Sequence, residues 1–337
     1  MSDLGKVDAA FFADVLYPNL GAGRADVALG PQPGVDFGVL RVGADALVAA
    51  TDPLSVLAPL GLERGAELAL DIVLTDVAVS GIAPSHCAIA LTLPPEMPDA
   101  DAAAIWRGFD AHARALGVSI VDAHVGRYPG VESSWIGGAT GFGLGDPADL
   151  IRPNGARPGD AVVISTGPGA EVAGLASHLY PEALGVSDAD LAAAQDRLAD
   201  VRGVEDALAA AGAGDVSAMH DATEGGIVGG LTEMADGAGV RIDLDSAAVP
   251  VADGVEAVCG ALGVDPWHVT SCGTLLVTVD PDDAEGVVSA LENRGTPAAV
   301  VGSVNEGSGL YVDGERRRAP ERDPSWAAMA ALAERTE

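Results

Sequence analysis

Residues 67–81 read ELALDIVLTDVAVSG, an apolar run that carries two aspartates. Leu68, Ile72, Asp76 and Val79 recur at helical spacing, which predicts a helix with a buried face. Asp76 stands among apolar neighbours, and a buried carboxylate is costly unless it is paired or bound to a cation. The segment therefore predicts a functional carboxylate on a buried helix. The open alternative is a residue that faces solvent in a chain rich in aspartate.

Two further aspartates resemble Asp76 in their setting. Asp52 follows the apolar run of residues 47–50, and Pro53 after it is expected to end a strand and open a loop. Asp36 lies in the earlier stretch Pro33-Gly34-Val35-Asp36. Because Mg²⁺ prefers hard oxygen ligands and takes a few carboxylates plus nucleotide phosphates, Asp36, Asp52 and Asp76 are candidate metal ligands. A simple loop cap at Asp52 remains the alternative.

Residues 220–227, HDATEGGI, follow a short apolar strand and precede a helical pattern. Paired glycines let backbone amides approach a phosphate, and a helix N-terminus favours anions, so Gly225 and Gly226 are candidate phosphate-binding residues. Asp221 can add a carboxylate and Thr223 a hydroxyl donor. The alternative is an ordinary helix start with Thr223 or Asp221 as N-cap. The pattern is neither a Walker A loop nor a GxGxxG fingerprint.

Glycines and prolines divide the chain near its middle. The glycine-rich run of residues 137–145 is predicted as a connecting loop, and three prolines follow within residues 147–158. Strand-like and helix-like segments occur on both sides of this stretch. We therefore predict an N-terminal domain over residues 1–150, a second domain over residues 155–315, and a charged helical tail over residues 316–337.

Composition restricts the partners and the compartment. The formal net charge is -32, while 48% of the residues are hydrophobic, which predicts a folded protein with an acidic, salt-adapted surface. Such a surface disfavours nucleic acid, which is bound by basic clusters. No apolar run is long enough to span a membrane, and residues 1–10 lack a signal-peptide pattern, so we expect a cytoplasmic protein. Lys6 is the single lysine, which argues against a P-loop or Schiff-base lysine.

Cysteines and histidines give no metal-binding pattern. Cys87, Cys259 and Cys272 form no CxxC pair, and we expect them to be reduced and structural. The six histidines are scattered singly, although His124 and His220 lie at predicted strand ends. A Cys/His nucleophile is the minor alternative.

The order of these segments resembles that of a known superfamily. It comprises AIR synthase (PurM), the hydrogenase maturation protein HypE, thiamine-monophosphate kinase, selenophosphate synthetase and formylglycinamidine synthetase. The resemblance covers residues 26–312 and is strongest to HypE-like AIR synthase-related proteins of haloarchaea. It is carried by Ala50-Thr51-Asp52, by residues 75–81, by Pro33-Gly34-Val35-Asp36 and by residues 220–227.

This resemblance implies an α+β, PurM-like two-domain fold. The N-terminal domain would pair with its twin into a shared β-barrel, giving a homodimer, and the C-terminal α/β domain would pack a mixed sheet on helices. ATP and Mg²⁺ are the implied cofactors. The implied ligands are Asp36, Asp52 and Asp76 for the metal and nucleotide, with Thr223, Gly225 and Gly226 toward phosphate or substrate. The implied chemistry is γ-phosphoryl transfer, in which metal and donor electrostatics carry most of the catalysis.

Three departures from the family pattern affect the functional prediction. HypE ends in a reactive cysteine, whereas this chain ends in Arg335-Thr336-Glu337, and no cysteine precedes Cys87 where selenophosphate synthetase needs one. His124 stands where relatives carry an acidic residue, which removes one expected carboxylate. Asp221 and His124 are the predicted catalytic residues.

The main functional prediction is an ATP- and Mg²⁺-dependent phosphoryl-transfer enzyme acting on a small amide- or phosphate-containing metabolite. The alternative is a nucleotide-binding paralogue that assists hydrogenase or other metal-centre maturation. A plain acidic scaffold is the third and weakest interpretation.

Overall fold

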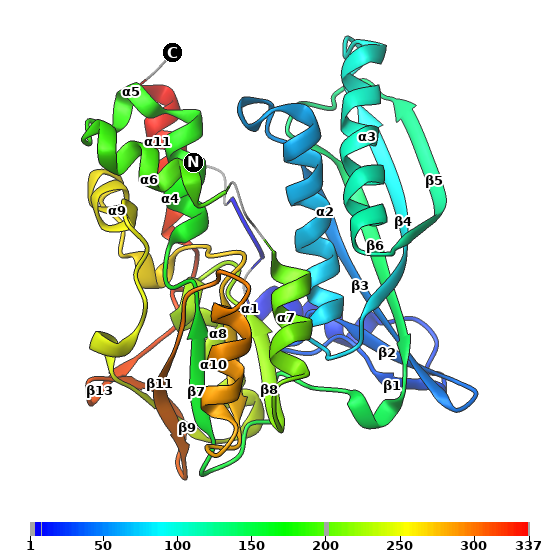
Figure 1. Ribbon diagram of the computed structural model, residues 1–337. Coiled ribbons are helices and arrows are strands. Elements are labelled where there is room, and N and C mark those ends of the chain that lie inside the picture. The colour runs from blue at the N-terminus through cyan, green and yellow to red at the C-terminus, as the bar shows by residue number, and fades with distance from the viewer. Residues whose placement is uncertain (1–3, 8, 199–201, 336–337) are drawn as a thin grey trace.

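Two β-sheets organise the chain, each with its own helices, and they lie side by side (Figure 1). The computed structural model describes residues 4–7, 9–198 and 202–335. The two-sheet, two-half architecture agrees with the predicted two-domain α+β fold. No helix in these described ranges is both long and apolar enough to cross a membrane.

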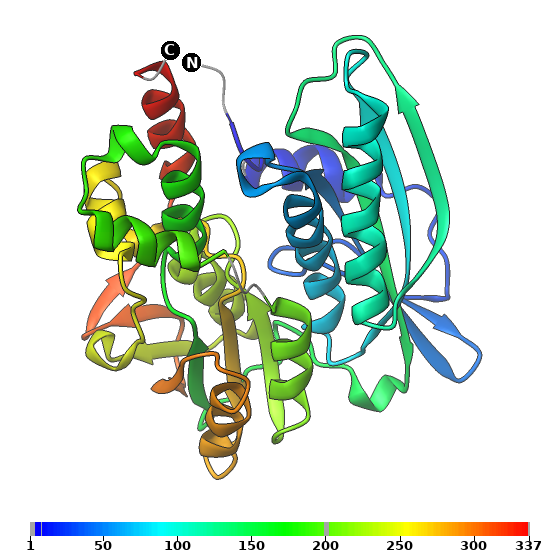
Figure 2. The ribbon, with the colours of Figure 1, turned by 45° about the horizontal axis from the view of Figure 1, so that its top comes forward.

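The first half is a six-stranded sheet with two long helices on one face. Its strand order is β1-β2-β3-β6-β4-β5, antiparallel except for the parallel pair β4–β5, which α3 connects. Figures 1 and 2 show α2 and α3 lying across the same face of this sheet. The elements are β1 (Val27–Leu29), β2 (Gly38–Val42), β3 (Asp45–Ser55), α2 (Leu62–Ala78), β4 (Pro84–Leu93), α3 (Asp99–Ala115), β5 (Ser119–Arg127) and β6 (Trp135–Gly145).

The predicted helix around Asp76 is confirmed and is longer than expected, since α2 begins at Leu62. Its buried face includes Leu70, Leu74 and Val77, which pack against the sheet. The prediction that Pro53 ends the preceding strand is wrong. Strand β3 continues to Ser55, because Pro53 keeps extended backbone opposite Gly138 and the register shifts only after it.

The predicted glycine-rich loop is also wrong, because residues 135–145 form the central strand β6. A Cβ atom on Gly141 would lie 3.0 Å from Leu74 Cδ2 and 3.1 Å from Val77 Cγ2. One on Gly143 would lie 2.9 Å from Val77 Cγ1. The glycines therefore serve close packing of α2 on the sheet, a tertiary requirement that resembles a turn signal in the sequence.

The second half is a seven-stranded mixed sheet in the order β13-β12-β9-β11-β7-β10-β8, with only β9–β12 parallel. Helices α7 and α10 cover one face, and α8 covers the other. Helices α4, α5, α6, α9 and α11 form a separate group beyond one end of the sheet (Figure 2). The strands are β7 (Ala161–Ser165), β8 (Val216–Asp221), β9 (Arg241–Leu244), β10 (Leu275–Val279), β11 (Ala298–Asn305), β12 (Gly309–Val312) and β13 (Glu315–Arg317).

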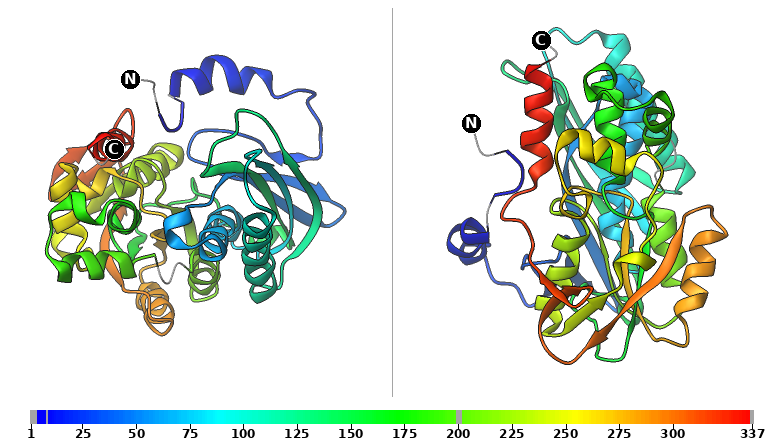
Figure 3. Two further views of the ribbon diagram at one scale, coloured as in Figure 1. Left: turned by 90° about the horizontal axis from the view of Figure 1, so that it is seen from above. Right: turned by 90° about the vertical axis from the view of Figure 1, so that its left-hand side faces the viewer.

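The remaining helices are α1, near the N-terminus, and the helices of the second half. They are α1 (Ala9–Phe11), α4 (Ala170–Leu179), α5 (Pro181–Leu184), α6 (Asp188–Asp196), α7 (Gly203–Ala211), α8 (Gly226–Ala238), α9 (Val255–Leu262), α10 (Ala284–Glu292) and α11 (Pro324–Glu334). The segment predicted as a charged helical tail thus contains most of β13 and all of α11. Helix α11 packs beside α9 through the buried Leu332 (Figure 3).

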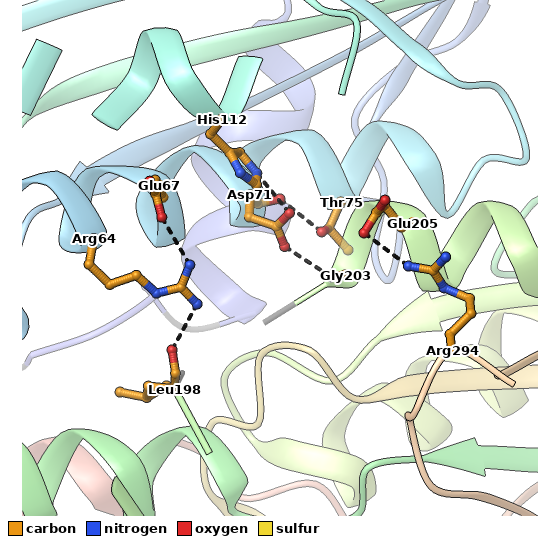
Figure 4. Close-up of polar contacts among 9 residues, drawn as sticks. All are labelled: Arg64, Glu67, Asp71, Thr75, His112, Leu198, Gly203, Glu205 and Arg294. Carbon is orange, nitrogen blue, oxygen red and sulfur yellow. Dashed lines mark hydrogen bonds and ion pairs between the residues drawn. The ribbon is translucent and has the colours of Figure 1, made fainter. Parts of the chain in front are cut away.

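The two halves share one hydrophobic core and a polar junction between α2 and α7 (Figure 4). One carboxylate oxygen of the buried Asp71 accepts the Gly203 amide at 3.0 Å, and the other lies 2.9 Å from His112 Nε2. Arg64 adds a hydrogen bond to the Leu198 carbonyl at 3.0 Å. These contacts fix the second half against the helices of the first, which positions the residues that face the space between them.

We expect Gly203→Ala to lower the free energy of unfolding by about 1–3 kcal/mol through overpacking. The new Cβ atom would lie 2.3 Å from Thr75 Oγ1 and 3.2 Å from Asp71 Oδ2. Gly212→Ala, at the other end of the same helix, meets nothing closer than 3.4 Å and is the matched control. Thermal and denaturant unfolding measure the stability of both variants. A Gly203→Ala protein as stable as the wild type would contradict this interpretation.

Candidate metal and nucleotide site

Asp221 is the most unusual charged residue of the second half. It ends β8, its side chain is fully buried, and neither carboxylate oxygen has a hydrogen-bond partner within the described chain. A buried carboxylate that accepts no hydrogen bond is disfavoured, because nothing replaces the hydrogen bonds that water made to its oxygens. The position therefore indicates a carboxylate that awaits a ligand.

His220 lies beside Asp221 and links it to two other acids. Its Nδ1 lies 3.6 Å from Asp221 Oδ1, and its Nε2 lies 3.2 Å from Glu233 Oε2 and 3.5 Å from Asp36 Oδ2. Burial opposes the charged ring, but Asp221, Glu233 and Asp36 together raise the pKa of His220 well above its usual value. In the absence of a metal, His220 is therefore an imidazolium that balances these carboxylates.

Donor atoms of Asp36, His220 and Asp221 all lie within 4.8 Å of one another, which is close enough to hold one ion. Asp36 comes from the loop before β2, so this group joins the two halves of the chain. Burial alone would raise the pKa of Asp36, but Lys6 and His220 lower it. Asp36 is thus ionised and available as a ligand.

Asp52 and Asp76 face the same acidic space from β3 and α2. Burial is the main cause that raises the pKa of Asp52 to about 6, and the charges of Asp221 and Asp36 add to it. The pKa of Asp76 is raised well above its usual value by burial, then by Asp221, Asp36 and Asp52. Mutual repulsion of this kind falls when a divalent cation binds among the carboxylates.

Lys6 also belongs to this site, and sequence reasoning missed it. Its ammonium lies 3.7 Å from Asp36 Oδ1, and its backbone amide donates to Glu224 Oε2 at 2.8 Å. Asp36 raises the pKa of Lys6 against the opposing effect of burial, and Glu233, Asp76 and Asp52 also raise it. The available signal was its status as the single lysine of the chain. Glu233 was missed as well, since it is one acid among many on a helical face.

The paired glycines adopt the left-handed conformation that their turn requires, with φ of 83° at Gly225 and 63° at Gly226. Gly225 is the N-cap residue of α8, and no side chain caps this helix. The alternative prediction of Thr223 or Asp221 as N-cap is therefore wrong. The Gly225 amide donates to Asp323 Oδ2 at 2.9 Å. A carboxylate of the chain therefore holds one of the amides that were predicted to bind phosphate.

Thr223 contributes its backbone to the same turn. Its amide donates to the Asp221 carbonyl at 3.2 Å, and its carbonyl accepts the Gly226 amide at 3.0 Å. A Cβ atom on Gly226 would lie 2.6 Å from the Val269 carbonyl oxygen, so only glycine fits there. The turn thus holds Asp221 at the end of β8.

The structure does not bring His124 to the acidic cluster. His124 is aligned across the sheet with Ala90, Gly138 and Pro53. Asp52 is the residue before Pro53, so it is not in this row. Because side chains alternate between faces, His124 lies on the outer face of the sheet and Asp52 on the helix-covered face. His124 is exposed there and pairs with Tyr128 Oη at 2.8 Å.

The three cysteines are buried and free, as their sequence pattern predicted. Burial raises the pKa of Cys87 to about 11 and that of Cys259 to about 12. The pKa of Cys272 is also raised, by burial and then by Glu171 and Asp221. Because the thiolate is the nucleophilic form, these shifts disfavour the alternative of a cysteine nucleophile.

The residues present fit Mg²⁺ better than a softer metal. Asp36, Asp52, Asp76 and Asp221 offer carboxylate oxygens, which are the ligands of hard cations, whereas the raised pKa of His220 disfavours the neutral ring that would bind a softer metal. The unpartnered oxygens of Asp221 supply the strongest single indication. A divalent cation here would attract the phosphates of a nucleotide.

We expect Asp52→Asn to stabilise the cation-free protein at pH 7 by about 1–2 kcal/mol, because the folded state disfavours the charged form of this carboxyl. Between about pH 4 and pH 6, folded Asp52 keeps a proton that the unfolded chain has lost, so wild-type stability falls as pH rises. Mg²⁺ should recover that loss in the wild type and much less in the variant.

Thermal unfolding with and without Mg²⁺ measures both effects. Asp45→Asn, at an exposed position of the same strand, is the control and should leave both quantities unchanged. A destabilised Asp52→Asn protein that still responds fully to Mg²⁺ would contradict the assignment.

Comparison with known proteins agrees with this two-half arrangement. Residues 34–144 match the model of AIR synthase related protein, N-terminal domain, and residues 157–315 match the model of its C-terminal domain. Carbamoyl dehydratase HypE of Azotobacter vinelandii is 31% identical over 292 residues, which cover 85% of this chain and 83% of that protein.

Solved structures give the same fold. E. coli HypE, a hydrogenase maturation protein, superposes with a TM-score of 0.69 at 24% identity, covering 96% of this chain and 92% of that one. Aquifex aeolicus thiamine-monophosphate kinase, solved with AMPPCP and TMP, superposes with a TM-score of 0.68 at 21% identity, covering 84% and 89%. Because both domain models match and a relative is 31% identical over 85% of the chain, the chain belongs to the AIR synthase-related protein family.

Proposed function

We propose that this protein is an ATP- and Mg²⁺-dependent phosphoryl-transfer enzyme that acts on a small amide- or phosphate-containing metabolite. The observation that carries the proposal is Asp221, a fully buried carboxylate with two unpartnered oxygens beside Asp36 and His220. Enzymes among the relatives support it, since they include carbamoyl dehydratases and a selenide, water dikinase. The kinase solved with AMPPCP supports a nucleotide.

Asp36, Asp52, Asp76 and Asp221 would hold the metal between the two halves. Bound Mg²⁺ would neutralise charge on the triphosphate and favour departure of the γ-phosphoryl group. His220 Nε2 lies 3.2 Å from Glu233 Oε2, and a positive charge on this ring offsets part of the negative charge of the neighbouring carboxylates. Asp76 is buried on α2, the helix that packs closely on β6.

A second function has one specific observation in its favour. Asp323 occupies the Gly225 amide, so a phosphate could bind there only after that carboxylate moved. A protein that binds nucleotide without turnover, and assists hydrogenase or other metal-centre maturation, would tolerate this contact. The hydrogenase maturation role of its relatives supports the same alternative.

We also propose that the protein is a homodimer, acting in the cytoplasm. Leu40, Leu47 and Leu144 form a row across three neighbouring strands on the outer face of the first sheet. Leu144 is 51% exposed and Leu40 is 37% exposed. A second copy covering this face would remove the exposed leucines of this row from water.

We expect the wild type to bind ATP in concentrated KCl only when Mg²⁺ is present. Asp76→Asn should weaken that binding by about tenfold or more, because a metal-bound charged group is lost. Asp110→Asn, on the exposed side of α3, is the control. Calorimetry measures the binding, and release of ADP in a metabolite screen separates the enzyme from the non-catalytic alternative. A folded wild type that binds no Mg²⁺–ATP contradicts both functions.

We expect Leu144→Asp to convert the dimer into a folded monomer, because it places a charge in the apolar row that the partner would cover. Val251→Asp changes a similarly exposed residue, 43% exposed, in the second half and should leave the dimer intact. Light scattering after size exclusion, in concentrated KCl, gives the mass. A monomeric wild type, or a dimeric Leu144→Asp variant, contradicts the proposed assembly.

A further inference from the structure

The acidic cluster is served by few positive charges. Within the described chain, Asp36, Asp52, Asp76, Asp221 and Glu233 form no ion pair with an arginine, although the chain has many arginines elsewhere. Their cationic partners are His220 and Lys6. His220 is buried and held by three carboxylates at once. Lys6, by contrast, pairs with a single carboxylate among the described residues, so it is the cation of the cluster with the fewest contacts to lose.

The segment that carries Lys6 is fixed to the second half through its backbone. The Lys6 amide donates to Glu224, and a Cβ atom on Gly5 would lie 2.8 Å from both Glu224 Oε2 and Trp326 Nε1. Gly5 adopts a φ of 92°. Both this positive φ and the lack of space for a Cβ atom therefore favour glycine at this position. Figures 2 and 3 show the N-terminal segment passing beside α11 toward the first half.

The Lys6 side chain then crosses from this anchor to the first half. Its ammonium reaches Asp36, which belongs to the loop before β2, and the side chain stays 52% exposed. A side chain that is half exposed on a fixed backbone has room to turn toward another partner. The structure thus places a half-exposed cation beside the carboxylates that would hold the metal.

We infer that Lys6 is the phosphate-binding cation of this site, and that in the nucleotide-free protein it takes the place of the metal at Asp36. This inference rests on the proposed function. A triphosphate that enters among five carboxylates meets strong repulsion, which the metal offsets only in part. With a divalent cation held by Asp36, the Lys6 ammonium would no longer pair with that carboxylate and could pair with a phosphate oxygen instead.

Two opposite effects of one substitution follow from this dual role. Lys6→Met should weaken binding of Mg²⁺–AMPPCP by about 10- to 100-fold, the usual effect of losing a charge-assisted hydrogen bond. The same variant should bind Mn²⁺ more tightly than the wild type when nucleotide is absent, because no ammonium competes for Asp36. A residue with a merely structural role would not produce opposite changes.

The experiment measures both affinities by calorimetry in concentrated KCl. Lys6→Arg keeps the charge and should retain most of the Mg²⁺–AMPPCP affinity. Arg24→Met removes one exposed positive charge from the same terminal region, where it pairs with Asp26, and should change neither affinity. Unfolding temperatures of all variants establish that they are folded.

Either of two results would overturn the inference: unchanged Mg²⁺–AMPPCP affinity in Lys6→Met, or Mn²⁺ binding that is unchanged or weaker in that variant. A wild type that binds Mn²⁺ but no Mg²⁺–AMPPCP would refute the nucleotide function and the phosphate contact together. The Mn²⁺ comparison still reports whether Lys6 competes for Asp36, so the two failures are distinguishable.

Discussion

An excess of negative charge between the two sheets is the constraint on which the candidate site depends. Asp221 is buried without a hydrogen-bond partner, and Asp36, Asp52 and Asp76 approach it from the other half of the chain. Such an arrangement destabilises the folded protein unless a cation is bound, so packing elsewhere must offset it. The shared core, the close fit of α2 on β6 and the Asp71 junction supply that packing.

The balance of charge within the site explains why both halves are needed. His220 on β8 joins acids from the two halves, and Lys6 reaches from an anchor on the second half to Asp36 on the first. A shift of one half against the other would therefore change the distances that let one cation serve several carboxylates. Nucleotide binding at this position would be coupled to the relative placement of the two sheets.

Much of the fold and part of the site could be predicted from local patterns. Helical spacing around Asp76 and the strand-to-helix turn at Asp221 are features of short segments, so the sequence contains them directly. The glycines of β6 were misread because close helix packing is a tertiary demand that resembles a turn signal. Lys6 has no periodic context, and its role follows only from the folded position of the N-terminal segment. His124 was placed near the acids because sequence order does not reveal which face of a sheet a residue occupies.

The most direct test of the account is a crystal structure with Mn²⁺ and AMPPCP, in which anomalous scattering at the manganese edge locates the ion. We predict an anomalous peak about 2 Å from a carboxylate oxygen of Asp221, with Asp36 as a second ligand. An ion bound elsewhere, with both Asp221 oxygens still without a partner, would contradict the central claim that this buried carboxylate is a metal ligand.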